Sequence, residues 1–163
     1  MTGKVIKYGD NISTDAIIAG KYTKTLNFQD LADHAMEDLD PDFKTKLRDR
    51  KVIVAGTYFG CGSPREQAPT ALRVAGVQCV LAKEFARIFF RNAINVGMCV
   101  AECDTSLIDD GDEISFTPGD ACVVDHTKGI EIPVAAMPSM MVEILESGGV
   151  VNYLNQHNGQ LEG

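Results

Sequence analysis

Residues 51–66 read KVIVAGTYFGCGSPRE, an apolar run followed by a glycine-rich turn and a polar segment. The apolar residues Val52 to Ala55 are mostly β-branched, which is typical of a buried strand. Ser63 and Glu66 have the spacing of a capping box, and Pro64 suits the first position of a helix, where its missing N–H leaves no bond unmade. The segment therefore predicts a strand, a flexible turn and a helix that begins at Pro64.

Ser63 is open to two interpretations at this position. As a simple helix cap, its hydroxyl would accept a bond from a backbone N–H. As part of an anion-binding active site, it would lie beside unpaired N–H groups and the positive end of the helix dipole. Arg65 favours the second interpretation, because a cation in the first turn opposes the dipole and a guanidinium group binds carboxylates in a bidentate manner. Dinucleotide, phosphate-loop and nucleophile-elbow motifs fit less well, since each needs other residues at these positions.

Strands and helices alternate on both sides of this turn. After the helical pattern that ends at Ala75, residues 77–82 predict a second buried strand. Lys83 to Asn95 predict a helix with Phe85, Ile88, Phe89 and Ile94 facing the core, and Met98 to Ala101 predict a third strand. This order indicates parallel strands joined by crossover helices, and hence an α/β fold.

The C-terminal third of the chain has a different pattern. Short strands are expected at Glu113 to Phe116, Ala121 to Asp125 and Ile130 to Val134, where turn residues separate them into a small β layer. A helix is expected from Ser139 to Ser147, with Met140, Met141, Ile144 and Leu145 as its core stripe. A last helix should cover Val150 to Gln156, followed by a frayed tail from His157.

Composition narrows the class of protein. A chain of 163 residues predicts a single domain, residues 1–163, with enough length for a core. The net charge of −8 argues against a nucleic-acid or membrane-surface binder. The sequence has neither a signal peptide nor an apolar run of spanning length, so a cytoplasmic location is expected.

The five cysteines, Cys61, Cys79, Cys99, Cys103 and Cys122, are odd in number and scattered. This pattern indicates reduced core thiols and not a disulfide framework. No Cys-x-x-Cys pair occurs, so we expect no metal ligands in this chain, and in particular no iron–sulfur cluster bound by it alone.

Two motifs together resemble the aconitase superfamily. They are GCGSPRE at residues 60–66 and AKEFARIFFRNAINVG at residues 82–97. More narrowly, the chain is similar to the separate small subunits of the isopropylmalate isomerase and homoaconitase group, from about Gly9 to the C-terminal helix. The resemblance implies a swivelling β/β/α domain like the mobile fourth domain of aconitase. It also implies a hydro-lyase that is active only with a large partner subunit, which carries a [4Fe–4S] cluster.

The resemblance also assigns roles to individual residues. Ser63 would be the catalytic base, Arg65 would bind a substrate carboxylate, and Asp15 would pair with groups near the serine. From local chemistry alone, Asp15 could equally be a turn or helix cap. A family member often has a second serine where this chain has Pro64, so any contact made there must be absent or replaced.

The segment Tyr22-Thr23-Lys24-Thr25 resembles the loop that reads the variable part of the substrate in this family. Tyr22, Lys24 and Thr25 are therefore expected to bind substrate. Related chains often have an arginine or an apolar residue here, and Lys24 offers a charge without the fork of arginine. The alternative is that Lys24 is a solvated surface residue.

The resemblance implies that the substrate is a small hydroxy-di- or tricarboxylic acid. The first candidate is 2-isopropylmalate, which would be isomerised to 3-isopropylmalate in leucine biosynthesis. Homoaconitate, 2,3-dimethylmalate and citraconate are the alternatives within the class. A non-catalytic assembly or regulatory domain is an alternative from another class. A hydrolase using Cys61 or Ser63 is a third, although His34, His126 and His157 occur in no recognisable triad context.

Overall fold

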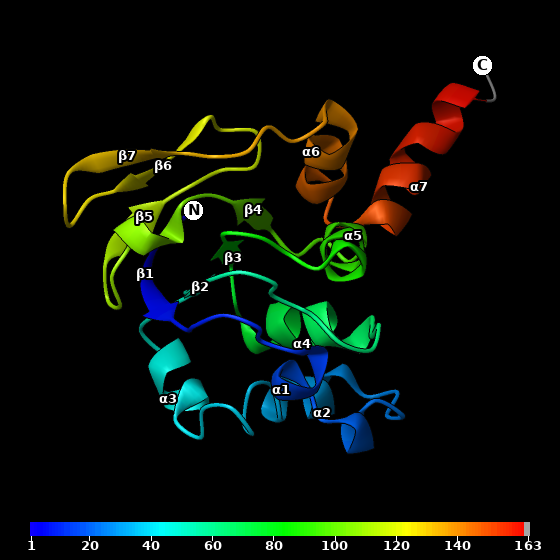
Figure 1. The fold of residues 1–163 in the computed structure, drawn as a ribbon. Helices are drawn as coiled ribbons and strands as arrows, with labels where there is room; N and C mark the ends of the chain where they lie inside the picture. The colour runs from blue at the N-terminus through cyan, green and yellow to red at the C-terminus, as the bar shows by residue number, and fades with distance from the viewer. Residues whose placement is uncertain (162–163) are drawn as a thin grey trace.

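The computed structural model describes the backbone of residues 1–161 and the side chains of residues 1–157. Seven strands form one sheet in the order β4-β3-β2-β1-β5-β6-β7 (Figure 1). They are β1 (Thr2–Lys7), β2 (Val52–Ala55), β3 (Cys79–Ala82), β4 (Val100–Glu102), β5 (Glu113–Ser115), β6 (Cys122–Asp125) and β7 (Ile130–Pro133). Strands β1 to β4 are parallel neighbours, and β5 to β7 continue the sheet in antiparallel pairing. The predicted α/β order and the three C-terminal strands are therefore confirmed.

The helices are α1 (Thr14–Ile17), α2 (Phe28–Asp33), α3 (Phe43–Leu47), α4 (Gln67–Ala75), α5 (Arg87–Asn95), α6 (Ser139–Glu146) and α7 (Val150–Leu161). Two short 3₁₀ turns cover Gly20–Tyr22 and Thr105–Leu107. Helices α1 to α4 gather on one side of the parallel strands, whereas α5, α6 and α7 lie together at the other end (Figure 1). In the part of the chain that the structure describes, no helix is long and apolar enough to cross a membrane.

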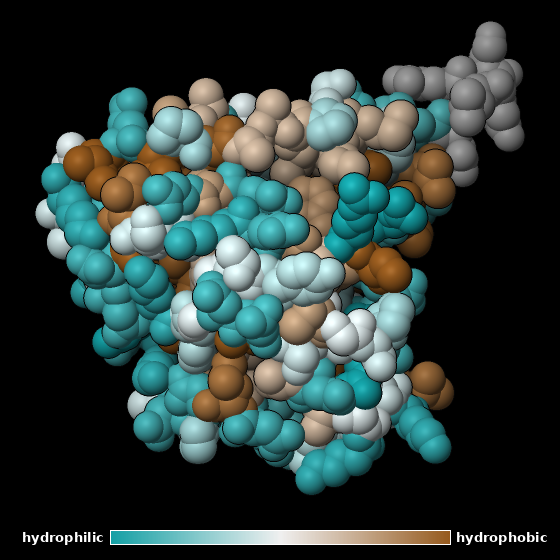
Figure 2. Space-filling model, viewed as in Figure 1, coloured by the Kyte–Doolittle hydropathy of each residue, from teal (hydrophilic) through white to brown (hydrophobic). Residues whose placement is uncertain are grey.

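Alternation along the central strand divides the core into two layers. Val52 and Val54 of β2 pack in a cluster that contains residues of β5, β6 and β7. Ile53 and Ala55, which point to the opposite face, pack in the cluster formed with the helices. The sheet therefore curls so that its antiparallel part covers one face of the parallel strands while the helices cover the other. Hydrophilic residues cover most of the face seen in Figure 2, and hydrophobic residues emerge only in separate patches.

Several element boundaries differ from the sequence prediction. Helix α5 begins at Arg87 and not at Lys83, because the preceding residues bond to the glycine-rich loop. Ile88 and Met140 are 52% and 60% exposed, so their assignment to the core was wrong. Helix α7 continues through Leu161, where a frayed tail from His157 was expected.

A buried pair of acidic residues ties the β5–β6 hairpin to the turn before it. Asp125 is fully buried on β6, and its Oδ2 atom receives no hydrogen bond from the described residues. Burial and the neighbouring Asp112 raise the pKa of Asp125. Although burial opposes it, bonds from the Asp109 N–H, Asp125 and Lys128 hold the pKa of Asp112 below its ordinary value. Of the two carboxyls, Asp125 therefore keeps its proton to the higher pH, and in its protonated form it donates a hydrogen bond to Asp112.

Asp125→Asn should increase the free energy of unfolding at neutral pH. The folded protein holds the Asp125 proton to higher pH than the unfolded chain, so the wild type loses stability as pH rises from the ordinary carboxyl pKa, about 3.9, to the raised one. An asparagine amide donates the same bond at every pH. Relative to wild type, the variant should gain stability as pH rises from about 4 towards the raised pKa, by about 1 kcal/mol, as urea denaturation would measure.

The matched control is Asp38→Asn, which removes one carboxylate from an exposed position. It should leave the pH profile of unfolding parallel to that of the wild type. A loss of stability in Asp125→Asn at neutral pH would contradict the raised pKa of Asp125, because it would mean that the folded protein stabilises the ionised carboxylate.

Candidate active site

A cleft of about 360 Å³ opens at the carboxyl ends of the parallel strands. The segments that form it follow β1, β2 and β3 in the chain, and the carboxyl edge of a parallel sheet is where α/β proteins commonly bind ligands. The lining residues are Thr14, Tyr58, Gly60, Cys61, Gly62, Pro64, Arg65, Glu84, Phe85, Ala86, Arg87, Ile88 and Phe89. Both sequence motifs described above therefore meet in one cavity.

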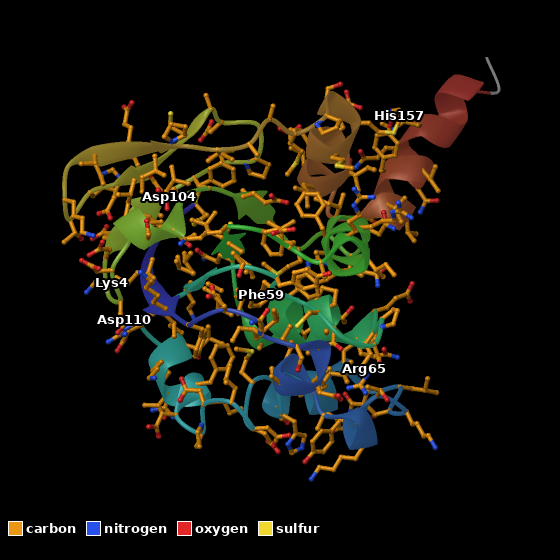
Figure 3. All side chains as sticks on the ribbon, viewed as in Figure 1. Lys4, Phe59, Arg65, Asp104, Asp110 and His157 are labelled. Carbon is orange, nitrogen blue, oxygen red and sulfur yellow. The ribbon has the colours of Figure 1, made fainter. Side chains whose placement is uncertain are left out.

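Backbone bonds and aromatic packing fix the glycine-rich loop to the start of α5. The Phe59 N–H donates to the Glu84 carbonyl at 3.0 Å, and the Ala86 N–H donates to the Phe59 carbonyl at 2.9 Å. The ring of Phe59 meets the rings of Phe85 and Phe89 edge to face, with centroids 5.8 Å and 5.2 Å apart. Figure 3 shows Phe59 deep in the fold and Arg65 beside α1. The floor of the cleft is thus a buried aromatic cluster.

Helix α1 holds the other side of the loop. Ser13 caps this short helix by accepting a bond from the Ala16 N–H. The Thr14 N–H donates to the Cys61 carbonyl at 2.9 Å, and the Thr14 hydroxyl donates to the Ser63 carbonyl at 2.7 Å. Because Thr14 is buried, these bonds are shielded from water, and they set the position of the Ser63 backbone.

Arg65 connects the loop to α1. Its guanidinium forms an ion pair with Asp15 and donates to the Ile18 carbonyl at 3.1 Å. The side chain of Arg65 is only 20% exposed and lines the cleft, whereas that of Asp15 is 69% exposed. The structure thus places Asp15 beside Arg65, and the partly buried Arg65 is one of the lining residues of the cavity.

The predicted helix start at Pro64 was wrong. Helix α4 begins at Gln67. Its N-cap residue is Glu66, whose side chain makes no capping hydrogen bond. Arg65 therefore precedes the helix. Its structural role is the contact with α1, which the sequence pattern could not reveal. The capping interpretation of Ser63 is excluded as well. Ser63 is exposed and is not itself a lining residue of the cleft, although its chain neighbours Gly62 and Pro64 are.

The segment Tyr22 to Thr25 lies outside the lining of the cleft. The Tyr22 ring stacks on the His34 ring, with the two ring centroids 3.8 Å apart. The Tyr22 hydroxyl donates to Glu37, and the Thr25 hydroxyl donates to Asp30. Lys24 is exposed. Their binding role therefore stays a prediction.

The loop nevertheless starts close to the site. A Cβ atom added at Gly20 would lie 3.3 Å from Nη2 of Arg65, and Gln67 of α4 donates to the Thr23 carbonyl. A shift of this loop would therefore reach Arg65 directly.

Arg65 alone among the predicted site residues lines the cleft, and the lining residues that were not predicted include Tyr58, Glu84, Arg87 and Ile88. Tyr58 has a left-handed backbone, with φ of 61°, which an L-residue with a large side chain rarely adopts. Its place in the glycine-rich turn, between Gly56 and Gly60, was the available signal. The other three lie in the second motif, where the helical pattern suggested a regular helix face.

The cysteines do not fit an iron–sulfur cluster. Among the described residues, no three His, Cys, Asp or Glu side chains group as metal ligands. Burial raises the pKa of Cys79, and burial together with Asp104 raises the pKa of Cys103 to about 12, so both remain protonated thiols. A cluster is held by several cysteine thiolates gathered in one place, and the described cysteines do not gather in this way.

The histidines are engaged away from the cleft. His34 pairs with Glu37, His126 bonds to Ser115, and His157 on α7 contacts the Tyr153 carbonyl (Figure 3). None of the three lines the cavity, which leaves Ser63 and Cys61 without a histidine base and disfavours the hydrolase alternative.

The chain belongs to the aconitase family, since residues 4–105 match the aconitase C-terminal domain. Its fold, with a TM-score of 0.92, is that of a crystal structure of 3-isopropylmalate dehydratase from Methanocaldococcus jannaschii, at 41% identity and covering 99% of this chain and 98% of that one. The predicted swivelling β/β/α fold is thereby confirmed.

Two curated relatives span nearly the whole chain. It is 53% identical over 158 residues to 3-isopropylmalate dehydratase small subunit 2 of Archaeoglobus fulgidus, with 96% of both chains covered. It is 44% identical over 155 residues to 2,3-dimethylmalate dehydratase small subunit of Eubacterium barkeri, covering 94% of this chain and 95% of that one.

Proposed function

We propose that this chain is the small subunit of a hydro-lyase of the 3-isopropylmalate dehydratase type, acting with a larger subunit as a heterodimer or heterotetramer. The observation that carries the proposal is the arrangement in which Thr14 and Asp15 of α1 hold Ser63 and Arg65 at the edge of one cleft. High identity over nearly full length to dehydratase small subunits supports it.

In this reaction a proton leaves a carbon beside a carboxylate, and a hydroxyl leaves the neighbouring carbon. Arg65 would bind the carboxylate through its guanidinium, which stabilises the negative charge that develops during proton removal. Ser63 would accept the proton, with Arg65 and the N–H groups of the glycine-rich turn favouring its ionised form. Asp15 would orient Arg65.

The remaining task is to activate the departing hydroxyl, and the residues that the structure describes include no group of side chains that could hold a metal for it. A [4Fe–4S] cluster on the larger subunit would supply that Lewis acid. The site is then complete only at the interface, and the isolated small subunit should be inactive. Lys24 and its neighbours Tyr22 and Thr25 would read the distal part of the substrate.

Ser63→Ala should abolish turnover in the complex with the large subunit, prepared without oxygen. The readout is the rate with isopropylmalate, 2,3-dimethylmalate, citraconate, citrate and homoaconitate in parallel. Loss of a general base lowers rates by about 10² to 10⁴-fold, and Ser63 is exposed, so folding should be unaffected.

Ser106→Ala, at an exposed serine outside the cleft, is the matched control and should retain full activity. Lys24→Ala should weaken or redirect substrate use. If the wild-type complex assembles with an intact cluster and converts none of these acids, the hydro-lyase proposal fails and the assembly-domain alternative stands.

Isopropylmalate is the first candidate substrate, since the relatives from A. fulgidus and from Caldanaerobacter subterraneus carry that name over 96% of this chain. The E. barkeri relative makes 2,3-dimethylmalate the second candidate. Both are malates with an added apolar group, so the same base and carboxylate contacts would serve either acid.

A further inference from the structure

Two large side chains stand half-exposed on the wall of the cleft. Tyr58 is 51% exposed and Ile88 is 52% exposed, and both line the cavity that contains Arg65. The aromatic residues beneath them, Phe59, Phe85 and Phe89, are buried. Scattered exposed apolar residues need no explanation, but two that share one cavity with a guanidinium form an amphipathic binding surface.

Tyr58 holds its position against a conformational penalty. A left-handed backbone costs a residue with a Cβ atom about 1–2 kcal/mol, and glycine or asparagine would adopt it more cheaply. Such outliers concentrate at ligand-contacting positions, where the surrounding structure maintains them. Here the bonds of Phe59 to Glu84 and Ala86 maintain it.

The same contacts set the relative position of the two side chains. Phe59 pairs with Phe85 in a parallel bridge, which places Tyr58 and the first turn of α5 on neighbouring segments. Ile88 is the second residue of α5, and Phe89 beside it packs on Phe59. These contacts therefore hold together the two backbone segments that carry Tyr58 and Ile88.

We propose that Tyr58 and Ile88 bind the apolar side group of the substrate and determine which alkylated malate is used. This inference rests on the proposed function and adds a second specificity determinant, on the wall of the cleft, to the loop at Tyr22 to Thr25. The segment Tyr22 to Thr25 keeps its hydroxyl groups on its own neighbours and outside the cleft. A branched alkyl group against Tyr58 and Ile88 would leave its carboxylate within the cavity that contains Arg65.

The test compares kcat/KM for isopropylmalate and 2,3-dimethylmalate in the assembled, cluster-containing complex. Tyr58→Asn and Ile88→Ala should each lower the ratio of the two constants, isopropylmalate over dimethylmalate, by about 10-fold or more, the effect of lost methylene contacts in an apolar pocket. Tyr58→Asn should also raise the melting temperature, because asparagine tolerates the left-handed backbone. Leu154→Ala on α7, at 51% exposure and outside the cleft, should change neither quantity.

Each alternative outcome is distinct. An unchanged ratio in an intact complex overturns the inference and leaves the proposed function standing. Loss of subunit association in Tyr58→Asn and Ile88→Ala also overturns it, because the two residues would then belong to the subunit interface. A wild-type complex that converts neither acid overturns the proposed function, and the inference falls with it.

Discussion

Replacing Arg65 with lysine should lower kcat/KM of the assembled enzyme by about 100-fold or more, the loss seen when one fixed donor to a developing anion is removed. Lysine keeps the positive charge but offers a single point donor in place of the planar fork. In the structure, one side of that fork is already used by Asp15 and the Ile18 carbonyl. A lysine that satisfied these two partners would keep a single N–H, which cannot form a bidentate bond to a substrate carboxylate.

The stability of Arg65→Lys should stay within about 1 kcal/mol of the wild type, because the Asp15 side chain is mostly exposed and such pairs contribute little. The control is Arg91→Lys, at an exposed position of α5 outside the cleft, and it should leave the kinetics unchanged. Steady-state kinetics and urea denaturation of the same preparations separate the two effects. If Arg65→Lys kept the wild-type kcat/KM, Arg65 would have no role in binding the substrate carboxylate. Its role would then be limited to connecting the loop to α1.

The position of Arg65 shows what the sequence could and could not predict. The strand Val52–Ala55 and the helix through Ala75 could be predicted from the local sequence, because the spacing of apolar residues among near neighbours indicates both elements. The partners of Arg65 come from residues 15 and 18, which meet it only because β1 and β2 are parallel neighbours. A contact of this kind depends on the topology of the sheet, so local chemistry suggested that Arg65 had no structural role.

The prediction of where α5 begins was wrong for a related reason. The residues before Arg87 have a helical pattern, but the backbone around Ala86 pairs with the glycine-rich loop and stays extended. Tertiary pairing therefore overrode helix propensity at the place where the cleft forms. As a result, Ile88 faces the cavity and not the core, and the apolar wall of the site was invisible in the sequence.

The residues that the family resemblance singled out thus acquire physical reasons from the fold. Ser63 is positioned through its backbone by Thr14, and Arg65 through its side chain by Asp15. Both depend on the path of the glycine-rich loop between α1 and α5. A change that moves this loop without touching any charged group should therefore damage the site as well as the fold.

Gly60→Ala is that change, and it should destabilise the protein by about 2–4 kcal/mol through backbone strain and overpacking. Gly60 has φ of +85°, and an added Cβ atom would lie 2.2–2.7 Å from the Cγ, Cβ and Cδ2 atoms of Phe89. Phe89 is buried in the aromatic cluster and cannot move aside without opening the floor of the cleft. The loop must shift instead, and the Gly60 N–H bond to the Ile12 carbonyl shifts with it.

Gly111→Ala provides a matched control. Gly111 has nearly the same backbone angle, φ of +87°, but an added Cβ atom would meet nothing within 4 Å. Its substitution should therefore cost only the left-handed conformation, about 1 kcal/mol. Urea denaturation of the two variants isolates the clash with Phe89 as the difference between them. Equal losses of unfolding free energy in the two variants would mean that Phe89 and its aromatic neighbours rearrange at little cost. The loop would then be too weakly held by the cluster to fix the positions of Ser63 and Arg65.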